Sequence, residues 1–223
     1  MAKRSADLTG IKESTVKEKI LKKVRNALIS KPENPFKDVD FNSSVYQKIE
    51  EDPVYQFVLN LKNAGGEFIY CEDEKAVFEN LKTLMKQEGW GDVFAADDKL
   101  MRLLTENDVR VESDPAKFSD QVAGITRCDF LVARFGSIIV SSGLASGRRM
   151  FVYPEAHIVI AGASQVVSEL KDALRGMREK YADKFPSQIT AITGPSRTAD
   201  IEKTLVMGAH GPRKLYLFMI DNQ

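Results

Sequence analysis

The chain has 223 residues, 43% of them hydrophobic, which is enough for one large domain, or a domain with an appendage, around a sizeable core. Its 32 basic and 32 acidic side chains cancel, which argues against nucleic acid or an anionic membrane as a general partner, because both bind through a positive field. No stretch approaches the roughly 20 apolar residues of a membrane span, and the N-terminus shows no secretory signal, so we expect a cytoplasmic protein.

The two cysteines, Cys71 and Cys128, lie far apart in the sequence and form no CxxC motif. They are too few to supply the thiolates that an iron–sulfur cluster or a structural zinc site usually takes. A disulfide is not expected in a cytosolic protein. We therefore predict two buried apolar residues, and we expect no metal or cofactor.

The N-terminal region is a basic exception within this neutral chain. Residues 1–31 contain nine Lys or Arg and three Asp or Glu, a net charge of +6. Within it, residues 12–30 carry apolar side chains at helical spacing and predict an amphipathic helix that packs on its own domain or on a second subunit. A membrane-surface helix is disfavoured, because the apolar stripe is narrow and has no Trp or Phe. Residues 31–53 hold three prolines and indicate a linker or wrapping arm, so we divide the chain into residues 1–53 and a domain at 54–223.

Strands and helices alternate regularly through the first half of the domain. The expected elements are a helix at 55–63, a strand at 67–71, a helix ending at Gly89, a strand at 92–96, a helix at 98–105 and a strand at 109–112. Alternation at this spacing is typical of a mainly parallel sheet that is covered on both faces. We therefore predict a doubly wound α/β domain.

Residues 117–150 follow a different pattern. Residues 118–125 indicate a short helix, and strands at 129–134 and 137–141 follow with only a tight turn between them. Strands this close must pair antiparallel, because a parallel crossover needs a dozen or more residues. We expect a β-hairpin inserted in, or appended to, the parallel sheet, and after it a flexible, partly basic loop at 141–149.

The C-terminal third returns to the alternating pattern. We expect a strand at 157–161, and then a helix that opens at Ser164 or Ser168 and ends near Tyr181. A βαβ unit closes the chain. It comprises a strand at 188–192, a helix with Ile201 and Leu205 on one face, and a strand at 214–220.

The turn at the start of that last helix, residues 193–202, is the strongest candidate site. In an open α/β sheet ligands bind outside the carboxyl ends of the strands, where this turn is expected to lie. A glycine allows close backbone approach, hydroxyls and an arginine can hold an anion, and the free N–H groups of a helix N-terminus add a favourable field. The residues concerned are Gly194, Ser196, Arg197, Thr198 and Asp200. Helix capping alone also explains the two hydroxyls and the aspartate, so both interpretations stay open.

Standard catalytic motifs are absent from the sequence. There is no GxGxxG after a strand, no GxxxxGK[ST], no HExxH and no GxSxG. Of the two histidines, His157 begins an apolar strand and is interpreted as a core or edge residue rather than a catalytic one. His210 follows the expected helix, where it either caps the turn or faces the sheet edge as a functional polar group.

Two segments near the C-terminus carry a recognisable pattern: Ile192-Thr193-Gly194-Pro195-Ser196-Arg197-Thr198-Ala199-Asp200-Ile201-Glu202 and Gly208-Ala209-His210-Gly211-Pro212-Arg213. They resemble the closing motif of LUD-domain proteins, the lactate utilization protein C (YkgG-type) family. The resemblance to this family extends back through His157-Ile158-Val159-Ile160, Ala163-Ser164-Gln165 and the hairpin at 124–142. The resemblance covers roughly the last hundred residues well and the first hundred in general pattern.

The resemblance implies a three-layer αβα domain of the sugar-isomerase and CoA-transferase-like type. It also implies a role in bacterial oxidation of L-lactate to pyruvate beside partner subunits, of which at least one carries iron–sulfur clusters. We therefore expect an accessory protein that binds a partner or a small anionic ligand, a carboxylate or a phosphate. The candidate contacts are the 194–200 turn together with Gly136, Ser137 and His210.

One position departs from the family pattern. Where relatives commonly read Ala-Glu-Thr-Gly-Thr at the hairpin, this chain reads Ala133-Arg134-Phe135-Gly136-Ser137. An acidic residue there would serve as base or nucleophile on a CoA-transferase-like scaffold, and an arginine does not. Arg134 is expected to hold an anion or to face solvent.

The alternative function is an enzyme that acts on a phosphorylated sugar or an acyl-CoA. In it, Ser196, Arg197 and Thr198 hold the phosphate, and Glu202 or His210 transfers protons. An enzyme should show an acid–base carboxylate aimed into a cleft beside the anion site. An accessory protein needs an exposed docking surface instead.

Overall fold

The computed structural model describes residues 15–29, 33, 36–40, 48–199 and 204–222. The chain divides into two units, Met1–Gln47 and Lys48–Gln223. The first unit contains the predicted amphipathic helix, α1 (Val16–Ile29), which has no buried side chain. Its apolar stripe is therefore exposed: Val16, Ile20, Leu21, Val24, Leu28 and Ile29.

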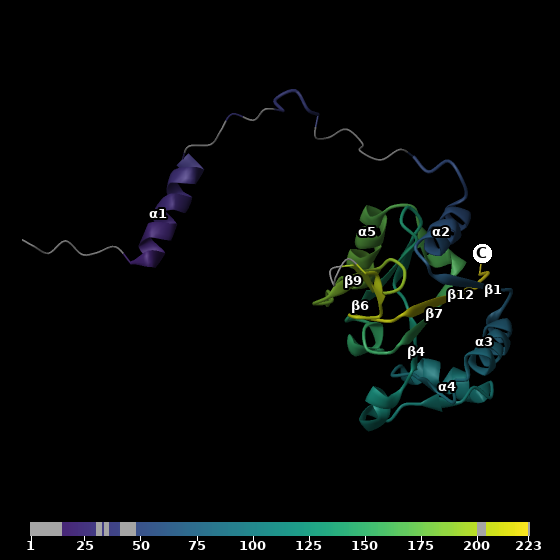
Figure 1. Cartoon of the computed structure of the whole chain (residues 1–223). Helices are drawn as coiled ribbons and strands as arrows, with labels where there is room; N and C mark the ends of the chain where they lie inside the picture. The colour runs from purple at the N-terminus through teal and green to yellow at the C-terminus, as the bar shows by residue number, and fades with distance from the viewer. Residues whose placement is uncertain (1–14, 30–32, 34–35, 41–47, 200–203, 223) are drawn as a thin grey trace, which may run out of the picture. The chain divides into compact units, whose positions relative to one another are not determined.

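A six-stranded sheet forms the centre of the second unit (Figure 1). Its strand order is β1-β12-β7-β4-β2-β3, and every neighbouring pair is parallel. The strands are β1 (Glu67–Cys71), β2 (Val93–Phe94), β3 (Val111–Glu112), β4 (Ala123–Arg127), β7 (Ala156–Gly162) and β12 (Lys214–Ile220). The predicted mainly parallel sheet is confirmed.

The helices of this unit are α2 (Pro53–Asn63), α3 (Glu74–Glu88), α4 (Asp98–Glu106) and α5 (Leu170–Lys180). An aspartate precedes each of the first three, and its carboxylate accepts a hydrogen bond from a backbone N–H of the first turn. Gly89 ends α3 with φ 71°, in the left-handed region that favours glycine. Local sequence signals therefore set the ends of these helices close to where they were predicted.

Apolar side chains on the two faces of the parallel sheet form two separate cores. One core includes Leu81 of α3 and Phe218 of β12, and the other includes Leu61 of α2 and Leu217 of β12. Leu217 and Phe218 are neighbours in one strand and point to opposite faces, as the pleat requires. The sheet is thus buried on both sides, with α3 and α4 on one face and α2 with a second sheet on the other (Figure 1).

The predicted hairpin lies in this second, four-stranded sheet, whose order is β8-β5-β6-β9. Its strands are β5 (Phe130–Val132), β6 (Ser137–Ser141), β8 (Val166–Val167) and β9 (Ile189–Ile192). β5 and β6 pair antiparallel, as expected from the short turn between them. β9 extends the hairpin, because it pairs antiparallel with the other side of β6.

Two predicted helices differ in extent from those observed. Residues 118–125 form the end of a short 3₁₀ helix (Pro115–Asp120) and the start of β4. β4 pairs with both β2 and β7 inside the sheet, and this pairing outweighs the local preference for a helix. The later helix begins at Leu170 rather than at Ser164 or Ser168, because β8 precedes it and pairs with β5.

The expected C-terminal βαβ unit is wrong. β9 belongs to the second sheet, and the segment expected to be helical contributes an antiparallel hairpin, β10 (Arg197–Thr198) with β11 (Val206–Met207). Residues 193–199 and 204–208 contain no helix, and residues 200–203 lie outside the described part. Leu205, expected on the inner face of that helix, is 62% exposed. An apolar position without a core to face gives a helix little stabilisation.

Candidate functional site

Three residues of the expected anion site form a joint between α2 and the second sheet. Gly136 and Gly194 both lie against the backbone of the last turn of α2. Their neighbours Ser137 and Thr193 share a hydrogen bond of 2.7 Å between hydroxyl oxygens. Asn60 of α2 donates through Nδ2 to two carbonyl oxygens of the β5–β6 turn. The structure therefore brings Gly136, Ser137 and Gly194 together, and their contacts are with the protein itself.

The next residues of the expected site belong to the β10–β11 hairpin. The Ser196 N–H donates to the Pro212 carbonyl oxygen at 2.8 Å, and the Ser196 carbonyl accepts from the Gly208 N–H at 2.9 Å. Arg197 and Thr198 form β10, with Arg197 exposed. These residues are not at a helix N-terminus, so the helix-dipole contribution expected for an anion does not apply to them.

The loop at 193–199 is also not at the carboxyl edge of the parallel sheet. It follows β9, a strand of the second sheet, so the general rule that ligands bind at the carboxyl edge of a parallel sheet does not apply to it. The carboxyl ends of β4, β7 and β12 border a different cavity of about 310 Å³, whose lining includes Arg127, Gln165 and Asn222. Asp200, the remaining candidate of the turn, lies outside the described residues.

Arg134 forms a partly buried ion pair with an acid of the same chain. Its Nε lies 2.8 Å from both carboxylate oxygens of Glu169, and its Nη2 lies 2.5 Å from Oε1. The two side chains are 19% and 14% exposed, and the hydrogen bonds from Arg134 lower the pKa of Glu169. Arg134 was expected to hold an anion or to face solvent, and the anion that it holds is Glu169, the residue that precedes α5.

Replacing Arg134 with Ala is expected to lower the free energy of unfolding by about 2 kcal/mol at neutral pH. The loss arises because Glu169 is left partly buried without its partner, and it stays below the cost of a fully buried pair because both side chains keep some exposure. The pKa of Glu169 is lower in the folded chain than in the unfolded one. The ion pair therefore stabilises the folded chain fully above the pKa of an unfolded glutamate, about 4.3. This stabilisation is lost as the pH falls through the lower pKa that Glu169 has in the folded chain.

Urea unfolding of the wild type, Arg134→Ala and Arg134→Ala/Glu169→Ala measures this contribution. The double variant should regain part of the stability, because it removes the unpaired carboxylate. The difference in free energy of unfolding between the wild type and Arg134→Ala should become smaller at acidic pH. Equal stability of these two proteins at neutral pH is the result that contradicts the prediction.

His157 and the cysteines belong to the core, as predicted. His157 on β7 is fully buried, and its Nε2 lies 2.8 Å from Thr126 Oγ1 on the neighbouring strand β4. Burial lowers the pKa of His157 to about 4, so the ring is neutral at pH 7. Cys71 and Cys128 are buried free thiols. Among the described residues, no group of three or more His, Cys, Asp or Glu side chains is placed to hold a metal ion.

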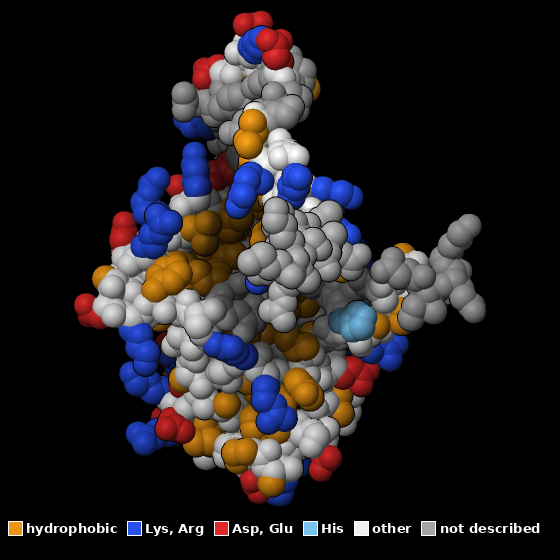
Figure 2. All heavy atoms as spheres, turned by 90° about the vertical axis from the view of Figure 1, so that its left-hand side faces the viewer, with side chains coloured by type: hydrophobic (Ala, Val, Ile, Leu, Met, Phe, Trp, Pro, Cys, Tyr) orange, Lys and Arg blue, Asp and Glu red, His pale blue; other side chains and the backbone are white. Residues whose placement is uncertain are grey.

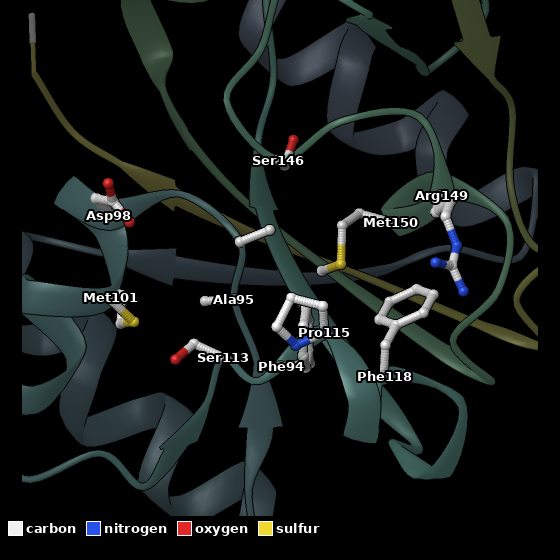
Figure 3. Close-up of a pocket in the computed structure, with 11 residues that line it drawn as sticks. Phe94, Ala95, Asp98, Met101, Ser113, Pro115, Phe118, Ser146, Arg149 and Met150 are labelled. Atoms are coloured by element: carbon white, nitrogen blue, oxygen red, sulfur yellow. The ribbon is translucent and has the colours of Figure 1, made fainter.

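A cavity of about 310 Å³, here named the Arg149 cavity, opens beside the carboxyl ends of β2 and β3 (Figure 3). Apolar side chains make up most of its lining: Phe94, Ala95, Met101, Pro115, Phe118 and Met150. Figure 3 shows Arg149 beside Phe118 at one side of the cavity, and Asp98 with Met101 at the other. An apolar lining with a few polar groups is the usual composition of a small-molecule site.

Arg149 lies over two aromatic rings. Its Cζ is 4.6 Å from the ring centroid of Phe118 and 5.1 Å from that of Tyr153, and the two rings are 5.7 Å apart. Contact with the ring faces orients the planar guanidinium and leaves the N–H groups at its edge. Within the described part of the chain, the guanidinium of Arg149 forms no hydrogen bond or ion pair, and the residue is exposed. These donors are available for an external carboxylate or phosphate.

Tyr153 lines another cavity, of about 430 Å³, here named the His210 cavity. Its walls are residues 152–155 and 208–211, together with Arg213. His210, a candidate from the sequence, lines it and is exposed. The second half of the recognisable motif therefore lies just before β7 and β12, beside the stack that Tyr153 forms with Arg149.

The layered architecture defines this protein as an α/β protein with a mainly parallel central sheet. The structure is similar to the crystal structure of a DUF162 family protein from Deinococcus radiodurans, with a TM-score of 0.58 and 19% sequence identity. The similarity covers 75% of this chain and 96% of that one. At this identity the likeness concerns the fold.

Sequence comparison identifies the family. The family model for the LUD domain matches residues 54–220. The chain is 32% identical to lactate utilization protein C of Macrococcus caseolyticus over 160 residues, which cover 65% of this chain and 68% of that protein. It is 34% identical to lactate utilization protein C of Geobacillus sp. (strain WCH70) over 164 residues, or 64% of this chain and 68% of that protein. The chain belongs to the LUD domain family.

Arg149 is a site residue that the sequence alone did not indicate. The loop at 141–149 was expected to be flexible, but its last residue, Arg149, begins a 3₁₀ helix (Arg149–Phe151) whose other two residues are apolar and buried. Met150 and Phe151, the apolar pair that follows Arg148 and Arg149, could have indicated an ordered segment, because buried side chains fix the backbone of the residues beside them. The aromatic partner Phe118 lies far away in the sequence, and no local pattern connects it to Arg149.

Proposed function

We propose that this protein takes part in lactate utilization as an accessory protein that binds a small organic carboxylate in the Arg149 cavity. The observation that carries the proposal is the exposed guanidinium of Arg149, which Phe118 and Tyr153 orient and which forms no ion pair within the described residues. The relatives named lactate utilization protein C support the metabolic setting.

A small carboxylate suits this arrangement for two reasons. Parallel N–H···O bonds from a guanidinium match the geometry of a carboxylate, and the apolar lining offers contacts for the hydrocarbon end of the acid. L-Lactate and pyruvate each combine a carboxylate with a small apolar end, so either satisfies this chemistry. We retain His210 as a second candidate contact, because it lines the adjacent cavity that Tyr153 borders.

We propose further that the protein works in the cytoplasm beside iron–sulfur oxidoreductase subunits. Oxidation of lactate to pyruvate releases electrons and protons, and iron–sulfur clusters are suitable acceptors of the electrons. The family resemblance supports this assignment, and the names of the relatives support the setting in lactate utilization. None of the helices that the structure describes is long and apolar enough to cross a membrane.

Calorimetric titration of the full chain with L-lactate and with pyruvate tests the ligand proposal. Arg149→Gln is expected to weaken binding at least about tenfold, because it removes charge-assisted hydrogen bonds. Arg102→Gln is the matched control, since Arg102 is exposed on α4 and is not part of the cavity lining. An unchanged affinity in Arg149→Gln, or no binding of either acid at millimolar concentration, would rule the proposal out.

A further inference from the structure

A fourth cavity, of about 610 Å³, lies between the loop that follows β6 and the turn that follows α5. Two cations from these separate segments line it, Arg148 and Lys184. Neither forms an ion pair within the described residues, and the lining residues, all of which are described, include no Asp or Glu. On the face that Figure 2 shows, Lys and Arg side chains are distributed among hydrophobic and acidic ones. The lining therefore carries two positive charges and no negative one, which favours an anionic ligand.

Two serines in the lining add hydrogen-bond donors. Arg148 Nη2 donates to Ser187 Oγ, and Ser187 Oγ lies 3.3 Å from Ser142 Oγ. The Gln188 N–H also donates to Ser142 Oγ, at 3.2 Å. One serine hydroxyl donates to the other, so the second hydroxyl hydrogen is free to bind an anion. Phosphate, with its several acceptor oxygens, uses this set of donors and cations more fully than a carboxylate does.

Aromatic rings form part of the wall, and one of them is held in place. The Tyr181 hydroxyl donates to Asp129 Oδ1 at 2.7 Å, and Lys180 Nζ lies 2.7 Å from the same oxygen. The Asp129 side chain is fully buried, so this anchor is fixed. Phe185, by contrast, lines the same cavity and is 52% exposed. A large exposed ring beside two cations offers a stacking surface for the organic part of an anionic ligand.

The geometry points to a binding site for an organic phosphate whose phosphate group lies between Arg148 and Lys184 and whose ring contacts Phe185. The volume is within the range of small-molecule sites and leaves room for a ring beside the phosphate group. Arg148 and Arg149 are consecutive, yet they line different cavities. The phosphate site is therefore separate from the carboxylate site, and the two proposals can fail independently.

Titration of the full chain with AMP, adenosine and inorganic phosphate tests this inference. AMP is expected to bind more tightly than adenosine or inorganic phosphate alone, because it contacts the two cations and the Phe185 ring together. Arg148→Gln and Lys184→Gln should each weaken AMP binding about tenfold, the usual effect of losing one charge-assisted contact. Phe185→Ala should weaken binding of AMP while leaving that of inorganic phosphate unchanged.

Arg178→Gln is the matched control, because Arg178 is exposed on α5 and does not line this cavity. It should leave AMP binding unchanged. If Arg178→Gln weakens binding as much as Arg148→Gln does, the attraction is a general effect of surface charge and the site is disproved. Absence of AMP binding at millimolar concentration overturns the inference as well.

Discussion

Replacing Gly194 with Ala is expected to lower the free energy of unfolding by roughly 4 kcal/mol. Gly194 has φ 76°, in the left-handed region where a Cβ costs about 1–2 kcal/mol. A Cβ built there would lie 2.1 Å from the carbonyl oxygen of Ala64, a backbone atom that moves only if the end of α2 moves. Overpacking of this kind adds roughly 1–3 kcal/mol. The glycine of the recognisable motif therefore holds the loop after β9 against α2.

Gly147→Ala is the matched control for this prediction. Gly147 has φ 70°, but a Cβ built there meets no atom within 4 Å. It should therefore show only the backbone cost of about 1–2 kcal/mol. Urea unfolding of both variants separates the effect of φ from the effect of close approach. Similar losses in the two variants would mean that the contact with α2 is not what requires a glycine at position 194.

Acidification from about pH 6.5 to about pH 4 is expected to cost about 3 kcal/mol of stability through His157 alone. The folded pKa of His157 is about 4, because the ring is fully buried, whereas an unfolded histidine titrates near 6.5. Between these values the unfolded chain binds a proton that the folded chain does not. Stability is therefore complete above the unfolded pKa and declines as the pH falls toward the folded one.

The double variant Thr126→Val/His157→Leu isolates this contribution. It replaces both partners of the buried hydrogen bond, so neither is left unsatisfied by the loss of the other. The stability of the variant, measured by urea unfolding across this pH range, should fall less steeply than that of the wild type. All other titrating groups are shared by the two proteins. Parallel pH profiles would show that His157 does not resist protonation in the folded chain.

Local pattern was sufficient for much of the fold. The helix that ends at Gly89 and the strands at β1, β7 and β12 were predicted close to their observed bounds, because capping residues and apolar runs are recorded directly in the sequence. The helix expected after Ser196 failed for the opposite reason. Its apolar positions had the right spacing, but Leu205 is exposed, and spacing does not reveal whether a core is there to receive it.

The candidate site was less predictable than the fold. The structure brings Gly136, Ser137 and Gly194 together: the two glycines lie against the end of α2, and Ser137 shares a hydrogen bond with Thr193. Arg134 was expected to hold an anion or to face solvent, and it pairs with Glu169, which local spacing does not connect to it. His210 is a candidate that lines a cavity, and the aromatic stack beside that cavity joins residues from separate segments.

The sequence by itself determined the alternating α/β architecture and, through its C-terminal motif, the family. Both depend on short-range order: burial periodicity, turn residues and an uninterrupted run of recognisable residues. Only the tertiary structure decided which side chains meet. It turned Arg148 and Arg149 toward different cavities and left Arg149 exposed over Phe118 and Tyr153. Such contacts depend on how distant segments pack across the sheet, and no local pattern specifies that packing.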